Sequence, residues 1–383
     1  MAETIDPRFT EISIKRLRQR QSYKWTHYPD DVLPAWVAEM DFPLAGPIKR
    51  ALVDAIELDD CGYSYPRALG LADAFAGFAK RRMGWEVNPE WVFPAIGIFS
   101  AVSATLNLVV KPGDTVIITT PAYHPFHTLV RELGCEVTDV PLIDNRLDPE
   151  AIDRCFAEGA AALILCSPHN PTGSVPDAEE LEAVAASAER HGTWVLADEI
   201  HGPLTLPQAD HIPFLTVCSE AADRSIVFCS ASKTFNIAGL KCSQIITDSE
   251  QASQVVRRLP ARVTDCGHLG AIASAAAFRE GEAWLDDVIK VLGHNRRLLG
   301  EHLAERLPAI RYVQPDAGYL AWLDLRDLKL GDNPSAAILR GSRLALSPGL
   351  DFGPGGAGFA RLNFATSPDL LEQALERLEK LVR

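Results

Sequence analysis

Lys233 lies in a segment whose residue types could do nucleophilic chemistry. The segment reads Cys229-Ser-Ala-Ser-Lys-Thr-Phe-Asn-Ile-Ala-Gly239, and an apolar run leads into it. A neutral lysine amine can attack a carbonyl group to form a Schiff base, or it can act as a base, and burial lowers its pKa toward neutrality. Taken alone, the pattern Ser-x-Ser-Lys also fits a surface lysine in a polar turn.

Asp198 is a candidate partner for a cationic group. It follows the apolar run Thr193-Trp-Val-Leu-Ala197 and begins the phrase Asp198-Glu-Ile-His201. A carboxylate at the end of a buried strand is costly unless a cation pairs with it. A protonated pyridine nitrogen would be such a cation, and a pyridinium ring accepts electrons from a neighbouring carbon. The alternative is an N-cap or a structural ion pair.

Two further polar side chains follow apolar runs. Asn170 stands in Cys166-Ser-Pro-His-Asn-Pro-Thr-Gly173, where prolines restrict the backbone. Its amide could donate to a ligand oxygen or to a substrate carboxylate, and a Pro-rich turn is the alternative. Tyr123 follows the run 116–119. Its ring could stack on an aromatic ligand or fill the core.

Short apolar runs alternate with helical stretches over much of the chain. The runs are Val116–Thr119, Glu136–Val140, Ala161–Cys166, Thr193–Ala197, Ile226–Cys229 and Gln244–Thr247. Strand runs separated by helices such as 178–191 predict an α/β fold with a mainly parallel sheet between helices. Ligands of such sheets collect at the carboxyl ends of the strands. We therefore expect the polar side chains that follow the runs to meet at one edge.

The chain length favours two domains. It has 383 residues, whereas one domain commonly has about 100–200. We expect residues 46–282 to form a large domain that binds the cofactor, and residues 283–383 to form a smaller α+β domain. That smaller domain would hold a long helix (284–307), strands near 318–324 and 359–364, and a final helix. The N-terminal segment 1–45 is expected to pack against it.

Composition narrows the classes of partner and the compartment. The net charge is −14, which argues against a nucleic acid or an anionic membrane surface as partner. The chain has no apolar run close to the ~20 residues that span a bilayer, and no signal-peptide pattern at its start. Free thiols in a reducing compartment, the cytoplasm, are expected from the cysteines, which lack C-x-x-C or zinc spacing. They are Cys61, Cys135, Cys155, Cys166, Cys218, Cys229, Cys242 and Cys266.

The order of these signatures resembles that of the fold-type I enzymes that depend on pyridoxal 5′-phosphate, the aminotransferase superfamily. The order is Tyr123, Asn170-Pro-Thr-Gly173, Asp198, Ser230-Ala-Ser-Lys233 and Arg361. The resemblance runs from Trp25 to the last helix. It implies an aspartate aminotransferase-like fold and pyridoxal 5′-phosphate as the cofactor.

Longer phrases are similar to the MalY/PatB branch of cystathionine β-lyases, which are C–S lyases. These phrases are Leu33-Pro-Ala-Trp-Val-Ala-Glu-Met-Asp-Phe42, Gly62-Tyr-Ser64, Asp198-Glu-Ile-His201, Ser232-Lys-Thr-Phe-Asn-Ile237, Tyr319-Leu-Ala-Trp-Leu-Asp-Leu-Arg326 and Arg361-Leu-Asn363. Ordinary aminotransferases usually carry tyrosine where His201 stands. The resemblance therefore implies α,β-elimination of a thiol from L-cystathionine or a related S-substituted cysteine, with pyruvate and ammonia as products.

The resemblance also implies roles in holding the cofactor. Lys233 would form the Schiff base, while Ser230 and backbone amides near Ile96-Gly97 would bind the phosphate. Tyr63 would reach the phosphate of a neighbouring subunit, which requires a homodimer with shared sites. The other cofactor contacts would be Asp198, Asn170, Tyr123 and His201.

Substrate binding and proton transfer complete the implied site. Arg361 would clamp the α-carboxylate, a bidentate task that suits a guanidinium, with Asn170 and Tyr319 beside it. Lys233 would remove the Cα proton, and either Lys233 or Tyr123 would protonate the leaving sulfur.

Two departures from the family pattern concern the phosphate end of the site, the part that would bind the phosphate group of the cofactor. The turn Pro94-Ala-Ile-Gly97 lacks the glycine with which the family's phosphate-binding turn begins, so the turn could be shifted. Lys241 stands where many aminotransferases place a phosphate-binding arginine. It either takes that role or faces solvent.

Two other functions use the same signatures. A class I/II aminotransferase would share the cofactor contacts and differ only in the later proton transfer. A protein of this fold used mainly for binding or regulation would keep the cofactor and lose turnover.

The Gly-rich stretch 353–358 precedes a strand and contains proline, so we expect a surface loop there. No metal is expected, because the histidines lack ligand spacing.

Overall fold

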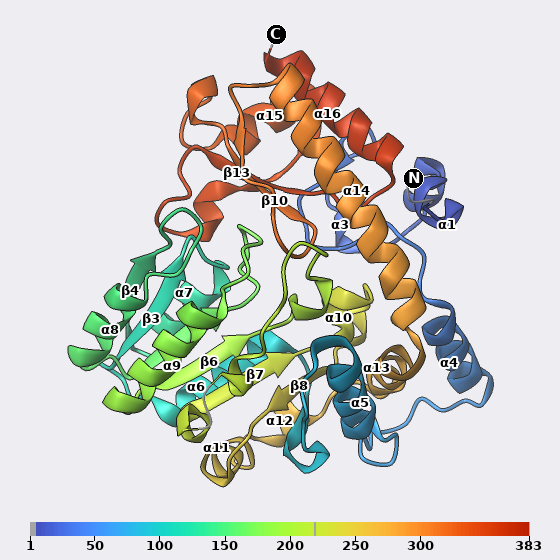
Figure 1. Ribbon diagram of the computed structural model, residues 1–383. Helices are drawn as coiled ribbons and strands as arrows, with labels where there is room; N and C mark the ends of the chain where they lie inside the picture. Colours follow the sequence, from blue (N-terminus) through green and yellow to red (C-terminus); the bar gives the residue numbers. More distant parts are fainter. Residues whose placement is uncertain (1–4, 218–219, 383) are drawn as a thin grey trace.

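A seven-stranded mixed sheet forms the centre of the structure (Figure 1). The computed structural model describes residues 5–217 and 220–382, so Cys218 lies outside the described residues. Across the sheet the strands are β2 (Val92–Ala95), β8 (Ser243–Ile246), β7 (Ser225–Cys229), β6 (Trp194–Asp198), β5 (Ala162–Cys166), β3 (Thr115–Thr120) and β4 (Glu136–Pro141). The strands from β7 to β4 are parallel, which confirms the predicted α/β fold.

Two strands at one edge differ from the expected pattern. β8 was expected within the parallel series, but it is antiparallel to β7. The connection 230–242 contains only the four-residue helix α10 (Ala231–Thr234) and one 3-10 turn, so no helix carries the chain back across the sheet. β2 was not predicted, because a four-residue strand that includes Pro94 has little strand signal; it pairs antiparallel with β8 at the edge.

The sheet is buried on both faces because successive side chains point to opposite sides. Within β5, Leu163 and Leu165 join one apolar cluster, whereas Ala162 and Ile164 join another. The strands β5, β6 and β7 have no exposed residue. Continuous apolar runs are therefore the signature of this doubly covered sheet.

Helices cover both faces of the sheet (Figure 1). The face of the sheet that carries Ala162 and Ile164 packs against residues of α6, α7 and α11. The opposite face packs against residues of α5, α8, α9 and α13. The helices of this part are α4 (Gly46–Glu57), α5 (Leu71–Met83), α6 (Ile98–Val109), α7 (Pro125–Glu132), α8 (Pro149–Ala157), α9 (Ala178–His191), α11 (Glu250–Val256), α12 (Ala261–Thr264) and α13 (His268–Glu280).

A second, four-stranded sheet lies in the C-terminal part of the chain. Its strands are β12 (Ser347–Pro348), β13 (Phe359–Asn363), β10 (Leu320–Asp324) and β9 (Arg311–Tyr312), and the pairs are antiparallel. The long helix α14 (Glu282–Arg306) leads from α13 to this part (Figure 1), and α15 (Pro334–Ser342) and α16 (Pro368–Val382) complete it.

The N-terminal segment contacts this C-terminal part. β1 (Leu33–Pro34) pairs with β11 (Leu344–Ala345), and Trp25 packs with Leu370 of α16. The segment also contains α1 (Pro7–Thr10), α2 (Ile14–Leu17) and α3 (Tyr23–Thr26). The division of the chain at residues 45 and 282 stays a prediction.

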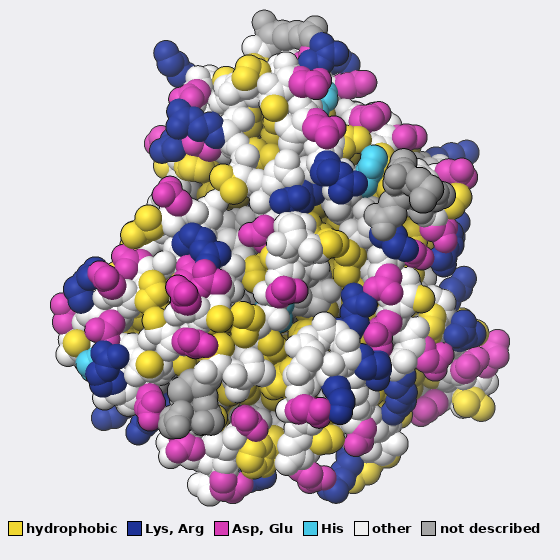
Figure 2. Space-filling view, in the orientation of Figure 1, with side chains coloured by type: hydrophobic (Ala, Val, Ile, Leu, Met, Phe, Trp, Pro, Cys, Tyr) yellow, Lys and Arg dark blue, Asp and Glu magenta, His cyan; other side chains and the backbone are white. Residues whose placement is uncertain are grey.

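Short 3-10 turns connect several elements. They are η1 (Pro89–Trp91), η2 (Gly202–Leu204), η3 (Phe214–Thr216), η4 (Glu220–Arg224), η5 (Ala238–Leu240), η6 (Arg326–Leu328) and η7 (Gly349–Phe352). Figure 2 shows acidic and basic side chains interspersed over one face. Within residues 5–217 and 220–382, no helix has the length and apolar character needed to cross a bilayer.

Candidate active site

A cavity of about 500 Å³ lies at the carboxyl edge of the parallel strands. Every predicted site residue except Tyr63 and Tyr319 lines this cavity. Its lining includes Ile96, Gly97, Tyr123, Asn170, Asp198, His201, Ser230, Lys233, Lys241 and Arg361. These residues come from the ends of β2, β3, β5, β6 and β7 and from the second sheet, as the rule for open α/β sheets predicts.

Lys233 projects from α10, directly after β7. Ser230 is the N-cap of this helix, and its hydroxyl oxygen accepts a hydrogen bond from Ser232 N across 3.0 Å. Lys233 Nζ donates to the carbonyl oxygen of Ala38 across 2.8 Å. Burial, with Arg361 nearby, lowers the pKa of Lys233 to about 8. A substantial neutral fraction is therefore present near pH 8.

Asp198 ends β6 and is buried. Its Oδ1 accepts a hydrogen bond from Ile200 N across 3.1 Å, and burial raises the pKa of its carboxyl group to about 7. Among the residues that the structure describes, no cation forms an ion pair with it. A cationic ring nitrogen would provide the missing partner and would restore the ionised carboxylate. The site therefore fits a protonated pyridine ring.

Arg361 lies on β13 and is also buried. Its Nη1 donates to Asn170 Oδ1 (2.9 Å), and its Nη2 donates to Trp36 O (3.1 Å) and Ser347 Oγ (3.2 Å). Its Nε has no hydrogen-bond partner among the described residues, and burial lowers its pKa to about 10. No carboxylate of the described chain pairs with it. A buried guanidinium held by neutral groups is suited to an anionic ligand.

His201 is a neutral group at the back of the cavity. Burial, with the charges of Lys233 and Arg361, lowers its pKa to about 3. Its ring lies edge-on to Tyr319 at a centroid distance of 6.0 Å, and Nδ1 has no partner in the described chain. The structure thus provides one unsatisfied ring nitrogen near the lysine.

Tyr123 and Tyr319 occupy different positions relative to the cavity. Tyr123 lines it, is 38% exposed and packs edge-on against Phe126. Burial and then Asp198 raise the pKa of its hydroxyl group. Tyr319 is fully buried outside the lining, and its hydroxyl donates to Ala38 O across 3.1 Å. It therefore shares an acceptor with Lys233.

The phosphate end needs one correction. The N–H of Ile96, expected to bind phosphate, instead donates to Val263 O across 2.8 Å, because helix α12 packs against strand β2. The candidate donors therefore begin at Gly97, which caps α6, and include the first turn of that helix at Phe99 and Ser100. Helix N-termini bind anions through their free N–H groups.

Ser230 and Lys241 flank the same end. The Ser230 hydroxyl donates to Cys242 O across 2.7 Å. Lys241 has a left-handed backbone (φ 57°), is exposed and lines the cavity. No side-chain hydrogen bond or ion pair of Lys241 occurs within the described part of the chain. Its location is compatible with either alternative left open by the sequence.

Tyr63 lies outside the cavity of its own chain and is fully exposed. The single chain therefore leaves the ring available for another molecule. A role in a neighbouring subunit stays a prediction.

The chain resembles known proteins over nearly its whole length. A model of the family "aminotransferase class I and II" matches residues 50–378. The chain belongs to this family. Cystathionine β-lyase of Corynebacterium glutamicum is 36% identical, covering 98% of this chain and 100% of the relative. Cystathionine β-lyase PatB of Bacillus subtilis is 34% identical, covering 94% and 96%.

Solved structures agree with the family assignment. Cystalysin from Treponema denticola, whose structure contains pyridoxal 5′-phosphate, superimposes with a TM-score of 0.91 at 28% identity, covering 99% of each chain. The aspartate aminotransferase-like fold and the C–S lyase branch predicted from the sequence are confirmed.

Several cavity residues of this family member were not foreseen. They include Val37, Ala38, Ile98, Phe99, Ser100, Phe126, Cys166, Ile200, Ala238 and Cys242. Most are apolar residues in runs that would equally fit a hydrophobic core, so only their place at the sheet edge distinguishes them.

No cluster of three potential metal ligands occurs within residues 5–217 and 220–382. His127 instead pairs with Asp139 at 2.7 Å.

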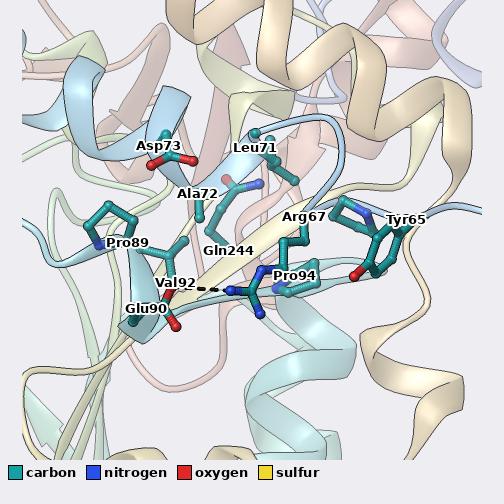
Figure 3. A pocket seen from close by; sticks show the side chains of 12 residues that line it. Tyr65, Arg67, Leu71, Ala72, Asp73, Pro89, Glu90, Val92, Pro94 and Gln244 are labelled. Atoms are coloured by element: carbon teal, nitrogen blue, oxygen red, sulfur yellow. Dashed lines mark ion pairs between the residues drawn. The ribbon is translucent and has the colours of Figure 1, made fainter.

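A second cavity of about 300 Å³ lies beside β2 and β8 (Figure 3). Its walls carry Arg67 and Glu90, which form an ion pair at 3.6 Å, while Gln244 contributes to its lining. The Gln244 amide is fully buried, and its Oε1 has no partner in the described chain. None of the predicted site residues lines this cavity.

Proposed function

We propose that this protein is a pyridoxal 5′-phosphate-dependent C–S β-lyase. It cleaves L-cystathionine or a related S-substituted cysteine to a thiol, pyruvate and ammonia. The observation that carries the proposal is the meeting of Lys233, Asp198 and Arg361 in one cavity, where none of the three forms an ion pair with a described residue. The similarity to cystathionine β-lyases over almost the full chain supports the reaction type.

The residues that would hold the cofactor surround the buried side of the cavity. Lys233 would bind it covalently, and Asp198 would pair with its ring nitrogen. Gly97, the first turn of α6, Ser230 and Lys241 would hold its phosphate, and Tyr123, Asn170 and His201 would contact the ring and its substituents. When bound, the cofactor supplies an electron sink for negative charge at the substrate Cα.

Arg361 and Asn170 bind and orient the substrate. The guanidinium would take the α-carboxylate in a bidentate geometry, for which its position inside the protein is favourable because bulk water is excluded. Asn170 already accepts from Nη1 at 2.9 Å, which leaves its NH₂ group to donate to a substrate or cofactor oxygen. A fixed carboxylate fixes the direction of the Cα–H bond.

Lys233 moves the proton at Cα. Its lowered pKa keeps enough of the amine neutral for this task near neutral pH. Once freed from its covalent role, the amine can take the Cα proton. Lys233 or the Tyr123 hydroxyl then protonates the leaving sulfur; both line the same cavity.

Amino transfer is the second candidate function, and it uses the same contacts. An aspartate aminotransferase from Pyrococcus abyssi is 27% identical over 92% of this chain. The neutral His201 favours elimination in our proposal, because it offers no acidic hydroxyl near the lysine. The higher identity to cystathionine β-lyases, 34–36%, points the same way.

Assembly and location are part of the proposal. We infer that two copies form a dimer, in which Tyr63 of each reaches the other's phosphate end. The complete exposure of this tyrosine supports it. A cytoplasmic location is supported by the free thiols of the seven cysteines within the described residues.

The decisive assay supplies L-cystathionine and measures pyruvate, ammonia and free thiol. Equal amounts of all three are expected, with no requirement for a 2-oxo acid. Transfer of the amino group to a 2-oxo acid without release of pyruvate would replace the proposal by the aminotransferase. Binding of the cofactor without turnover of either kind would favour a binding or regulatory role.

A further inference from the structure

Two cysteines, Cys242 and Cys266, lie on neighbouring backbone segments beside Ser230 and Lys241. Cys242 begins the segment that leads into β8, and Cys266 directly precedes Gly267, the residue that caps α13. Both side chains are buried, and each thiol shifts the pKa of the other. Cys266 Sγ also lies 3.9 Å from Ser64 Oγ. The thiols thus join segments that are distant in sequence.

Glycines bring the two backbones together. Gly267 N donates to Lys241 O across 3.0 Å. A Cβ atom at Gly270 would lie 2.1 Å from Leu240 O and 3.1 Å from the Cβ atom of Cys242. No other residue fits at position 270 without moving the backbone of segment 240–242. The hydrogen bond between Gly267 N and Lys241 O sets the peptide unit that follows Cys266 beside the peptide unit that precedes Cys242. A disulfide needs two neighbouring backbones of this kind, since its Cα atoms lie roughly 4.4–6.8 Å apart.

The two thiols differ in acidity in a way that suits exchange chemistry. The neighbouring Cys242 thiol lowers the pKa of Cys266, whereas the Cys266 thiol and burial raise the pKa of Cys242. Cys266 is therefore the nucleophile of the pair. By contrast, burial raises the pKa of Cys135, Cys166 and Cys229. A mild oxidant should discriminate between these groups.

Cys242 lies between two cavities. It lines the active-site cavity, and its Sγ accepts a hydrogen bond from Gln244 Nε2 at 3.7 Å. Gln244 in turn lines the second cavity, where Figure 3 shows its amide among the wall residues. A small neutral oxidant that enters the active-site cavity therefore reaches the cavity side of the pair at Cys242 without unfolding the chain.

We propose that Cys242 and Cys266 form a reversible disulfide when a peroxide oxidises the protein. The Cys266 thiolate attacks one oxygen of hydrogen peroxide, the O–O bond breaks, and a proton converts the leaving hydroxide to water. The resulting sulfenic acid is attacked by Cys242 sulfur, and the Cys242 proton leaves with the hydroxyl as a second water. Two thiols and one peroxide thus give one disulfide and two waters.

The pair adjoins three residues to which we assign contacts with the phosphate. Cys242 O accepts the Ser230 hydroxyl hydrogen bond, Lys241 is the preceding residue, and Ser64 follows Tyr63. Forming the S–S bond draws Cys266 away from Ser64 and shifts the backbone at Cys242. The oxidised protein should hold the cofactor less tightly. This consequence rests on the proposed function, whereas the chemistry of the thiols does not.

The test oxidises the cofactor-loaded protein with hydrogen peroxide in a Cys61→Ser background, which removes the exposed thiol. Intact mass should fall by two hydrogen atoms. Trypsin places Cys242 in peptide 242–257 and Cys266 in peptide 263–279, each with one cysteine. A linked pair of these peptides that dithiothreitol separates is the expected result. Failure to find it, or a link between other cysteines, would overturn the proposal.

Cofactor retention supplies the second readout. After oxidation the dissociation constant of the cofactor should rise about tenfold, the effect of losing one hydrogen bond to a charged group, and dithiothreitol should reverse the change. Cys242→Ser and Cys266→Ser should each abolish the peroxide-induced change, while Cys155→Ser keeps it. Formation of the linked peptide with unchanged retention would refute the coupling to the phosphate end. An inactive but normally oxidised protein would instead count against the lyase assignment.

Discussion

The guanidinium of Arg361 donates a hydrogen bond to the side-chain amide of Asn170 across 2.9 Å, although the two residues are 191 positions apart. The contact joins β13 of the second sheet to the loop after β5. It also fixes the Asn170 amide, since Oδ1 faces Arg361. Ligand-binding groups from the two parts of the chain are thus oriented by each other.

Replacing Arg361 with lysine should reduce kcat/KM for L-cystathionine about a hundredfold, mainly through a higher KM, because lysine cannot hold a carboxylate with two parallel hydrogen bonds. Steady-state kinetics measures the effect. Arg326→Lys is the matched control, because Arg326 forms an exposed ion pair with Asp324 at 2.7 Å. Equal effects of the two substitutions would argue against the carboxylate clamp.

Asp198→Asn should slow turnover about a thousandfold with little change in KM, because the amide cannot stabilise a positive ring nitrogen. A primary isotope effect with substrate deuterated at Cα should appear or grow, since removal of that proton becomes rate-limiting. The exposed Asp332→Asn serves as control. An unchanged kcat in Asp198→Asn would contradict the electron-sink role.

Asp198 should also make the stability of the cofactor-free protein depend on pH. Burial raises its pKa from 3.8 to about 7, so the folded state binds more protons than the unfolded state between these values. The stability that this carboxyl group contributes to the folded state is fully present below about pH 4 and is lost as the pH rises through about 7. The melting temperature of Asp198→Asn relative to wild type should therefore rise over this range. A flat difference would show that the carboxyl group is not perturbed.

Gly270→Ala should destabilise the fold by about 2–4 kcal/mol, because the new Cβ atom meets Leu240 O at 2.1 Å. Gly293→Ala, within α14, is the control. Its Cβ atom would have only Arg297 Nη1 within reach, at 3.7 Å, so we expect a gain of about 0.5–1 kcal/mol. Denaturant midpoints measure both. Similar midpoints for the two variants would disprove the close approach.

The sequence predicted the parallel strands and many of the polar residues that line the cavity, because both leave local signals. Runs such as 162–166 are apolar throughout, and Asn170, Asp198 and Lys233 follow strands that end at one edge. The antiparallel direction of β8 was missed because pairing direction depends on the connection and leaves no trace in the run itself.

Contacts between distant segments also could not be predicted. The Ile96 N–H is bound by Val263, and Ala38 accepts from both Lys233 and Tyr319. Backbone groups look alike in any sequence, so only the fold shows which of them are already satisfied. For the same reason the thiol pair of Cys242 and Cys266 was invisible, since 24 positions separate its members and neither lies in a motif.

The most direct test of the account identifies the lysine that carries the cofactor. The loaded protein is reduced with borohydride, which makes the covalent link permanent, and its peptides are sequenced by mass spectrometry. The account predicts a single labelled residue, Lys233, and no label in Lys233→Ala. A label on Lys241, which lines the same cavity, or on any other lysine would contradict it.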